Sequence, residues 1–314
     1  MENTFNDALK NGDIQELRRF KKSDRHNHGF LGGRLDYFAG EFGIYIDRPP
    51  STYQGIEELQ AWVDNKFLPR FEGASGFEKT YEASFFAAKQ DGVTSLEMNI
   101  DVMHSSRFNG SVGTLIDFLE GIHQRIAPDI QFVPEIGFNR HIDASVLLEW
   151  FEPYLAYDYF QSIDLYATEF VQPIKNFREI YKLAKGKGMR LKAHIGEFGP
   201  PESIVEAIET LDLDAVQHGI RAVESQDVME YLKERQIPLH ICPTSNVRLG
   251  IIKDYSSHPI RKLFDYGIYV TINSDDIAAF DSSVSGEYIH LYEANLFSAT
   301  ELDKIRENGL NINQ

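Results

Sequence analysis

Short apolar or β-branched segments alternate along the chain with longer segments in which apolar residues recur every three to four positions. The short segments predict buried strands, and the recurrence predicts amphipathic helices. Helices are predicted over 146–155, 176–189, 201–213 and 225–237, with a covering helix beyond Glu287. The predicted strands number eight: 23–29, 93–101, 130–138, 160–167, 190–197, 215–219, 238–246 and 269–276.

This alternation predicts the fold. Strands that alternate with helices form βαβ units around a parallel sheet. Eight such units in 314 residues predict an α/β fold, a single (β/α)8 TIM barrel over residues 1–314. The interval 30–92 between the first two strands contains two helical segments, 57–67 and 78–90. We therefore expect a helical insertion after strand 1 that covers the barrel mouth as a lid.

The charge and cysteine content exclude several classes of partner and site. Lys and Arg number 31 and Asp and Glu 48, which gives a net charge of −17. Nucleic acids and anionic membranes need a basic footprint, so we expect a small-molecule partner instead. Cys242 is the only cysteine, which rules out an intrachain disulfide and a cysteine metal cluster. The sequence has no apolar stretch long enough to cross a bilayer and no signal-like N-terminus, so we expect a cytoplasmic protein. The sequence does not indicate its oligomeric state.

Several chemically active residues fall at the predicted carboxyl ends of strands. His26 and His28 are two residues apart in the first strand, so their imidazoles point to the same side. His194 lies in the fifth strand, and Asp275 lies in the Asn-Ser-Asp-Asp run of the eighth. The carboxyl ends of barrel strands converge on one site. Three neutral imidazoles and one carboxylate suit a zinc ion that keeps an open position for water.

The same strand ends supply acid and base groups. Glu197 follows His194 by three residues and is placed to donate a proton, while His218 and Asp275 are placed to take or steer a proton of the water. Plainer alternatives exist, because a His-x-His pair is often only half-buried polar surface and Asp275 with Asp276 can cap a helix. Of the other six histidines, His104 is a candidate substrate contact, and four have expected structural places: His123 and His141 at the surface, His240 packed in a strand and His258 capping a helix.

The runs AHIGE, QHGIR, ICPTSN and HPIRKLFDYGIYVTINSDD follow one another in this order. With the His-Asn-His of the first strand, they resemble the adenosine deaminase family of the amidohydrolase superfamily over residues 22–301. The resemblance implies a barrel of the metal-dependent hydrolase type with one Zn²⁺, or another divalent metal, per chain. It implies these roles: His26, His28, His194 and Asp275 as metal ligands, Glu197 as the acid that protonates purine N1, His218 as the residue that orients and deprotonates the water, and Asp276 as the hydrogen-bond partner of N7.

Three positions depart from the family pattern at the substrate end of the site. Phe30 stands where an acidic residue contacts the ribose, Ala167 where a glycine lies against the purine, and Ile277 where a proline is usual. With His28 and Asp276, Phe30 and Ala167 are the expected substrate contacts. The expected reaction converts adenosine or 2′-deoxyadenosine to inosine or 2′-deoxyinosine and ammonia. The alternatives are the same chemistry on adenine, a modified adenosine, an adenine nucleotide or a pterin, a non-catalytic purine-binding protein, and a metal-dependent amide or phosphoester hydrolase, which two metal ions per chain would favour.

The run GFLGGR after the first strand leaves a further choice open. Its glycine amides and Arg34, with Arg25 beside the two histidines, are able to hold an anionic group of a substrate. The plainer interpretation, which we favour, is that the glycines turn the chain and Arg34 is solvated or paired. Phe30, Tyr37 and Phe38 are alternatively expected to form an apolar lid over a base.

Overall fold

Eight parallel strands form one sheet that curls into a barrel, as the alternating pattern predicts. Each strand pairs with the next in sequence order. A parallel bridge between Asn27 of the first strand and Asp275, just after the eighth, closes the barrel. The computed structural model describes residues 4–311, so residues 1–3 and 312–314 of the predicted domain lie outside it. The strands are β1 (Lys22–His28), β2 (Val93–Asp101), β3 (Gln131–Asn139), β4 (Ser162–Tyr166), β5 (Arg190–Ile195), β6 (Ala215–His218), β7 (Leu239–Ile241) and β8 (Val270–Ile272).

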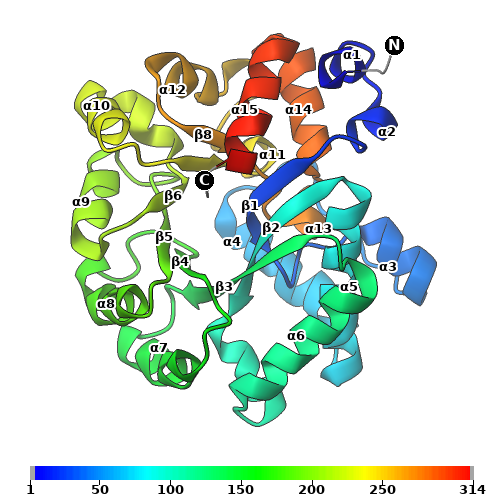
Figure 1. Cartoon of the computed structure of the whole chain (residues 1–314), viewed down its shortest axis with the longest axis vertical. Helices are drawn as coiled ribbons and strands as arrows, with labels where there is room; N and C mark the ends of the chain where they lie inside the picture. The colour runs from blue at the N-terminus through cyan, green and yellow to red at the C-terminus, as the bar shows by residue number, and fades with distance from the viewer. Residues whose placement is uncertain (1–3, 312–314) are drawn as a thin grey trace.

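Helices form an outer ring around the strands (Figure 1). The predicted terminal helix is present as two helices, α14 and α15, and two short N-terminal helices that the pattern did not predict, α1 and α2, pack beside them. Among residues 4–311, no helix has both the length and the apolarity that crossing a bilayer requires. The helices around the sheet are α1 (Phe5–Lys10), α2 (Ile14–Leu17), α5 (Gly73–Gln90), α6 (Val112–Ile126), α7 (Ala144–Phe151), α8 (Arg178–Gly186), α9 (Glu202–Leu211), α10 (Gln226–Glu234), α12 (Ile260–Tyr266), α14 (Val284–Glu293) and α15 (Ala299–Asn311).

The carboxyl ends of several strands come earlier than the sequence predicts. The prediction of a strand over 238–246 is wrong beyond Ile241, because Pro243 opens the helix α11 (Pro243–Arg248). Proline has no N–H to give to a sheet and suits the first turn of a helix. Asn246 is therefore helical. The predicted strand over 269–276 likewise ends at Ile272, and Asp276 is the N-cap of the short helix α13 (Ile277–Phe280).

The interval after β1 forms the expected insertion at the carboxyl end of the barrel. It contains α3 (Leu35–Phe42), α4 (Ile56–Trp62), a π-helical turn (Val63–Phe67) and a 3₁₀ turn (Leu68–Arg70) before α5. In Figure 1, α4 lies behind the ring of strands. The insertion has an apolar cluster of its own, separate from the main core and joined to α11 and α13: Phe38, Tyr53, Leu59, Trp62, Val63, Phe67, Phe71, Ala83, Leu249, Ala278, Ala279 and Phe280.

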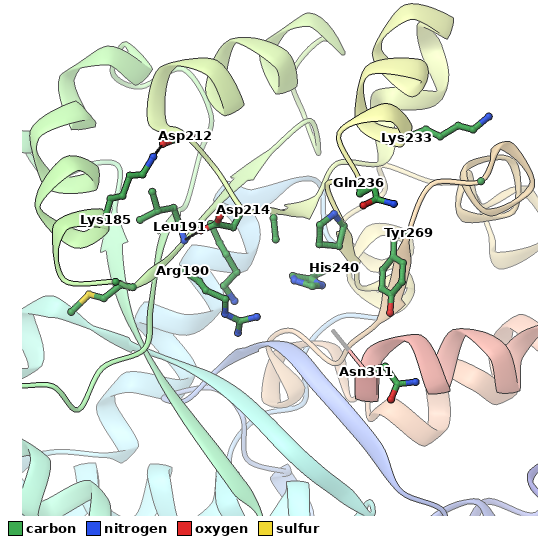
Figure 2. A pocket seen from close by; sticks show the side chains of 16 residues that line it. Lys185, Arg190, Leu191, Asp212, Asp214, Lys233, Gln236, His240, Tyr269 and Asn311 are labelled. Carbon is green, nitrogen blue, oxygen red and sulfur yellow. Dashed lines mark hydrogen bonds and ion pairs between the residues drawn. The ribbon is translucent and has the colours of Figure 1, made fainter. Parts of the chain in front are cut away.

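Residues at or near the amino ends of β5, β6, β7 and β8 line a cavity of about 990 Å³, which we call the lower chamber (Figure 2). Lys192 lines it and forms ion pairs with the buried carboxylates of Glu97 and Glu135. Arg190 also pairs with Glu97, and His240 is fully buried in β7, as predicted. Charges of opposite sign therefore pair with one another beside the lower chamber.

Candidate active site

The carboxyl ends of four strands bring the predicted metal and acid–base residues to one cavity of about 460 Å³, which we call the upper cavity. His26 and His28 lie on β1, His194 lies on β5, His218 ends β6, and Asp275 follows β8. The ring centroid of His26 lies 4.6 Å from that of His194 and 4.6 Å from that of His218. His28, His194, His218 and Asp275 line the upper cavity, and His26 lies just beneath it. Phe30, Ala167, Glu197 and Asp276 also line the cavity.

His26 and His194 present the same kind of nitrogen atom to each other. Nδ1 of His26 lies 3.2 Å from the carbonyl oxygen of His240, and Nδ1 of His194 lies 3.1 Å from the carboxylate of Asp164. In neutral rings both Nδ1 atoms therefore carry the proton, and both Nε2 atoms, 3.0 Å apart, present lone pairs. One cation between them, a proton or a metal ion, satisfies this contact. Zn–N bonds of about 2.0–2.1 Å would put two ligand nitrogens roughly 3.3 Å apart.

The protonation states of the imidazoles suit metal binding. Burial lowers the pKa of His28 to about 4 and lowers that of His26 well below its usual range. Burial also acts to lower the pKa of His194, but the charge of Asp164 outweighs it and raises this pKa. A carboxylate on Nδ1 also makes Nε2 a more basic ligand and fixes the ring orientation. Neutral His26 and His28 bind a metal without first losing a proton.

Asp275 completes the donor set. Its Oδ1 lies 3.6 Å from Nε2 of His28 and 3.9 Å from Nε2 of His26. Ligand atoms of His26, His28 and His194 lie within 4.8 Å of one another, and so do those of His28, Asp275 and Asp276. Three imidazoles and a carboxylate, each held by hydrogen bonds or packing, fit a divalent ion such as zinc.

Three residues at the rim of the upper cavity have a strained backbone. Ala167, His218 and Asp275 adopt left-handed conformations, with φ of +78°, +61° and +59°. Each such non-glycine residue costs on the order of 1–3 kcal/mol, and strain of this kind clusters at functional sites. At position 167 the family's glycine would adopt this conformation freely, so the alanine keeps the glycine's backbone shape at an energetic cost.

Glu197 lies on the turn after β5, and a second glutamate holds that turn in place. The carboxylate of Glu169 accepts hydrogen bonds from four consecutive backbone N–H groups, those of residues 196–199, at 2.8–3.3 Å. Oε1 of Glu197 accepts a hydrogen bond from Nδ2 of Asn246 (2.9 Å). Burial, together with the charges of Asp275 and Glu169, raises the pKa of Glu197 well above its usual range. Burial therefore favours the protonated, acid form of Glu197 in the upper cavity.

Asp276 is available to a ligand. The alternative that it caps the following helix is wrong, because it is the N-cap residue of α13 but its side chain makes no capping hydrogen bond. Its Oδ1 is buried without a hydrogen-bond partner among the described residues, and Asp276 lines the upper cavity. Burial and the neighbouring charge of Asp275 raise the pKa of Asp276 well above its usual range.

The residues of the expected apolar lid separate in the structure. Phe30 lines the upper cavity, with its ring 5.7 Å from that of Phe67 and 5.9 Å from that of His104. Phe38 is buried in the cluster of the insertion, and Tyr37 stacks on Phe86 at 4.2 Å. Phe30 and His104 therefore line the cavity, whereas Phe38 and Tyr37 pack elsewhere.

Neither arginine of the expected anion site faces the upper cavity. Arg34 pairs with Asp36 (3.1 Å), as the plainer interpretation predicts. The guanidinium of Arg25 donates to the carbonyl of Gly309 on α15, away from the histidines. The glycine-rich run therefore turns the chain.

Several residues beneath the site were not singled out by the sequence. Asp164 and Glu169 act through contacts with residues 27–30 positions later, and Asn246 lay in a segment predicted as a strand. His258 does cap its helix, since its Nδ1 accepts the N–H of Ile260 (3.1 Å), but its Nε2 also contacts Asn246 (3.2 Å). The signals available were the motif letters Asp164-x-x-x-x-Glu169 and CPTSN, whose partners lie far away in the sequence.

Comparisons with known proteins agree with this geometry. The profile of the adenosine deaminase family matches residues 148–313. An adenine deaminase of Aspergillus fumigatus is 35% identical over 320 aligned positions, which cover 94% of this chain and 90% of that protein. An adenine deaminase structure from Arthrobacter aurescens has a TM-score of 0.80 at 24% identity, covering 92% of each chain. An amidohydrolase structure from Burkholderia ambifaria with bound Zn has a TM-score of 0.77 at 20% identity, covering 99% of this chain and 88% of that one.

The family match spans more than half of the chain, and the Aspergillus relative covers nearly all of it. The chain combines the eight-stranded barrel with an upper cavity that is lined by acid–base and metal-donor residues. The chain belongs to the adenosine deaminase family and is a hydrolytic aminohydrolase.

Proposed function

We propose that this chain deaminates a 6-aminopurine at a single metal ion and releases the 6-amino group as ammonia. One observation carries the proposal: a buried acid, Glu197, and a second buried carboxyl group, Asp276, face one cavity beside a three-histidine and aspartate donor set. Family membership supports the same reaction. Such a reaction belongs to purine metabolism.

The metal would be held by His26, His28, His194 and Asp275. We propose zinc, because the donors suit it and because an amidohydrolase of the same fold was solved with bound Zn. The bound ion would lower the pKa of a water molecule from 15.7 towards about 7 and so supply a nucleophile near neutral pH.

The chain's own residues would move the protons and orient the ring. Glu197 donates its carboxyl proton to purine N1 as the attacked C6 becomes tetrahedral. Nε2 of His218 faces Oδ2 of Asp275 at 3.7 Å, so His218 is placed to orient the attacking water and Asp275 to accept its proton and pass it to the leaving amino group. Burial keeps the pKa of His218 well below its usual range, so the imidazole is neutral. Burial raises the pKa of Asp276 and so favours the protonated form, which donates to N7.

The substrate end of the upper cavity favours a purine without a ribose. Part of the wall beyond the donor set is apolar and is formed by Phe30, Leu59, Val63, Leu68 and Met103, beside polar residues such as Gln60, Ser106 and Arg107. Phe30 has no group to hydrogen-bond a sugar hydroxyl, and a site lacking that partner gains nothing from a ribose. The Aspergillus relative is an adenine deaminase. We therefore propose adenine as the first substrate and adenosine, the reaction expected from the sequence, as the second.

The test is ammonia release from adenine, adenosine, 2′-deoxyadenosine, AMP and a pterin, with metal content measured on the same sample. The expected result is turnover with the highest kcat/KM for adenine and one metal ion per chain. Absence of ammonia from every compound, with metal bound, would overturn the proposal.

The role of Phe30 is tested by exchanging its chemistry. Phe30→Glu should raise the ratio of kcat/KM for adenosine to that for adenine, because a carboxylate can accept from the ribose. The control, Phe30→Leu, keeps the wall apolar and should keep the wild-type ratio. A substrate ranking that is the same in all three proteins would remove Phe30 as the selector.

A further inference from the structure

Two residues that the proposed reaction does not use, Asn246 and His258, form a hydrogen-bonded chain that ends at Glu197. Nε2 of His258 lies 3.2 Å from Oδ1 of Asn246, and Nδ2 of Asn246 lies 2.9 Å from Oε1 of Glu197. Nδ2 of Asn246 also lies 3.3 Å from Nδ1 of His218. Asn246 is fully buried, and His258 is only 2% exposed, so solvent does not compete for these contacts.

The helix that follows sets the tautomer of His258. The backbone N–H of Ile260 donates to Nδ1 of His258 (3.1 Å), so Nδ1 is the acceptor and the proton of the neutral ring lies on Nε2. Burial lowers the pKa of His258 to about 3, which keeps the ring neutral at ordinary pH. Among the described residues, the acceptor that the Nε2–H group contacts is the side-chain oxygen of Asn246.

This tautomer in turn sets the orientation of the Asn246 amide. An asparagine amide can present its oxygen or its NH2 group to a neighbour, and its hydrogen-bond partners decide which. Since the Nε2–H of His258 needs an acceptor, the oxygen faces His258 and the NH2 group faces Glu197 and His218. The two hydrogens of the NH2 group have two acceptors, Oε1 of Glu197 and Nδ1 of His218.

We infer that Asn246 and His258 are positioning residues: His258 fixes the amide of Asn246 in one orientation, and that amide fixes which oxygen of Glu197 carries the proton. Oε1 accepts from Asn246, so the acid proton lies on Oε2, the oxygen left for a substrate. The same amide, by donating to Nδ1 of His218, leaves the proton of the neutral His218 ring on Nε2. This inference rests on the proposed function, in which Glu197 is the proton donor.

Two substitutions of His258 separate positioning from helix capping. In His258→Asn, the short side chain keeps an oxygen near the Nδ1 position, where it can still cap the N–H of Ile260, but it does not reach Asn246. In His258→Gln, the amide nitrogen lies near the Nε2 position and still donates to Asn246, whereas the cap is lost. A capping role and a positioning role therefore predict opposite rankings of these two proteins.

The expected result is that His258→Asn lowers kcat by about tenfold and His258→Gln by no more than about threefold, with KM changed less than about twofold in both. Asn246→Asp, which replaces the donor to Glu197 by an acceptor, should lower kcat by about a hundredfold. The matched controls are His123→Asn and His123→Gln on α6, with metal content measured for every protein. A kcat at the wild-type level in His258→Asn, or an equal loss in both His258 variants, would overturn the inference.

A second readout does not depend on turnover. Long-range ¹H–¹⁵N correlation spectra of the ¹⁵N-histidine-labelled protein report the tautomer of each ring, and the signal absent from His258→Asn identifies His258. The inference expects the neutral Nε2–H tautomer throughout pH 5–8. An Nδ1–H tautomer, or protonation within that range, would overturn it. Failure of the wild-type protein to deaminate any purine would instead count against the proposed function, while the spectra still decide the tautomer.

Discussion

The two ends of the barrel both bury charged and polar groups, but they arrange them in opposite ways. At the lower end, the cation of Lys192, which lines the lower chamber, lies against the carboxylates of Glu97 and Glu135, and Arg190 pairs with Glu97. In the upper cavity, lone pairs of His26 and His194 face each other beside Asp275. The lower charges pair with charges of opposite sign, whereas the upper groups are complementary to a cation from outside.

This difference teaches which buried polar cluster is a site. Neither burial nor cavity size distinguishes the two ends. Both ends bury charged groups, and the lower chamber, at about 990 Å³, is larger than the upper cavity, at about 460 Å³. Among the described residues, every group of donors that could hold a metal lies at the upper end or just beneath it. The amino end of a TIM barrel generally contributes stability, and the carboxyl end contributes the chemistry. Three predictions sharpen this contrast.

Removing a donor at the upper end should have the largest effect. His194→Ala deletes one of the two facing Nε2 atoms and the partner of Asp164. We expect metal content to fall far below one per chain and kcat/KM for the best purine to fall by at least about a thousandfold, because the ion supplies the nucleophile. Mass-spectrometric metal analysis and ammonia release on one sample measure both. Retention of one metal ion and of turnover would place the site elsewhere.

Removing the central cation at the lower end should cost stability instead. Lys192→Met removes the cation that compensates the buried carboxylates of Glu97 and Glu135. We expect the free energy of unfolding to fall by about 3–5 kcal/mol. Urea unfolding measures the change. The matched control is Lys185→Met, whose pair with Asp212 lies at the exposed edge of the same chamber, and which should change stability by less than about 1 kcal/mol. Folded Lys192→Met protein that loses its metal would break the contrast between the two ends.

The smallest expected effect is a pH dependence at the lower end. Burial and the charge of Lys192 keep the pKa of His240 well below 6.5 in the folded chain. As the pH falls below about 6.5, the unfolded chain takes up a proton on His240 that the folded chain refuses, so stability is lost by up to about 1.4 kcal/mol per pH unit. His240→Gln lacks this linkage. The difference in unfolding free energy between wild type and His240→Gln should therefore shrink by about 1 kcal/mol from pH 6 to pH 5, and a constant difference would contradict the account.

The sequence predicts the barrel and the donor set because both depend on local spacing. Two histidines two residues apart in a strand share a side, and strand ends of a barrel converge whatever the distance in sequence. The periodicity of the helices is local too, and it correctly placed the helical insertion after β1. The error at 238–246 arose because an apolar run does not show where a strand yields to a helix, even though Pro243 marks the point.

The residues that hold the site in place could not be predicted in the same way. Glu169 stabilises the turn that carries Glu197, and His258 contacts Asn246. Both sets of hydrogen bonds form only once segments 12–30 residues apart have packed together. Hydrogen-bond partners of this kind leave no periodic signal in the sequence. The strained backbone of Ala167, His218 and Asp275 is likewise imposed by the surrounding structure.

The central claim is that Glu197 is the proton donor of a metal-dependent aminohydrolase, and Glu197→Gln tests it most directly. Glutamine keeps the shape and can still accept from Asn246, but it has no acid proton to give to the ring. The measurement is ammonia release from adenine and adenosine by Glu197→Gln, with metal content measured on the same sample. The account predicts wild-type metal content and a kcat lower by about 10²–10⁴-fold. Wild-type metal content with wild-type turnover would contradict it.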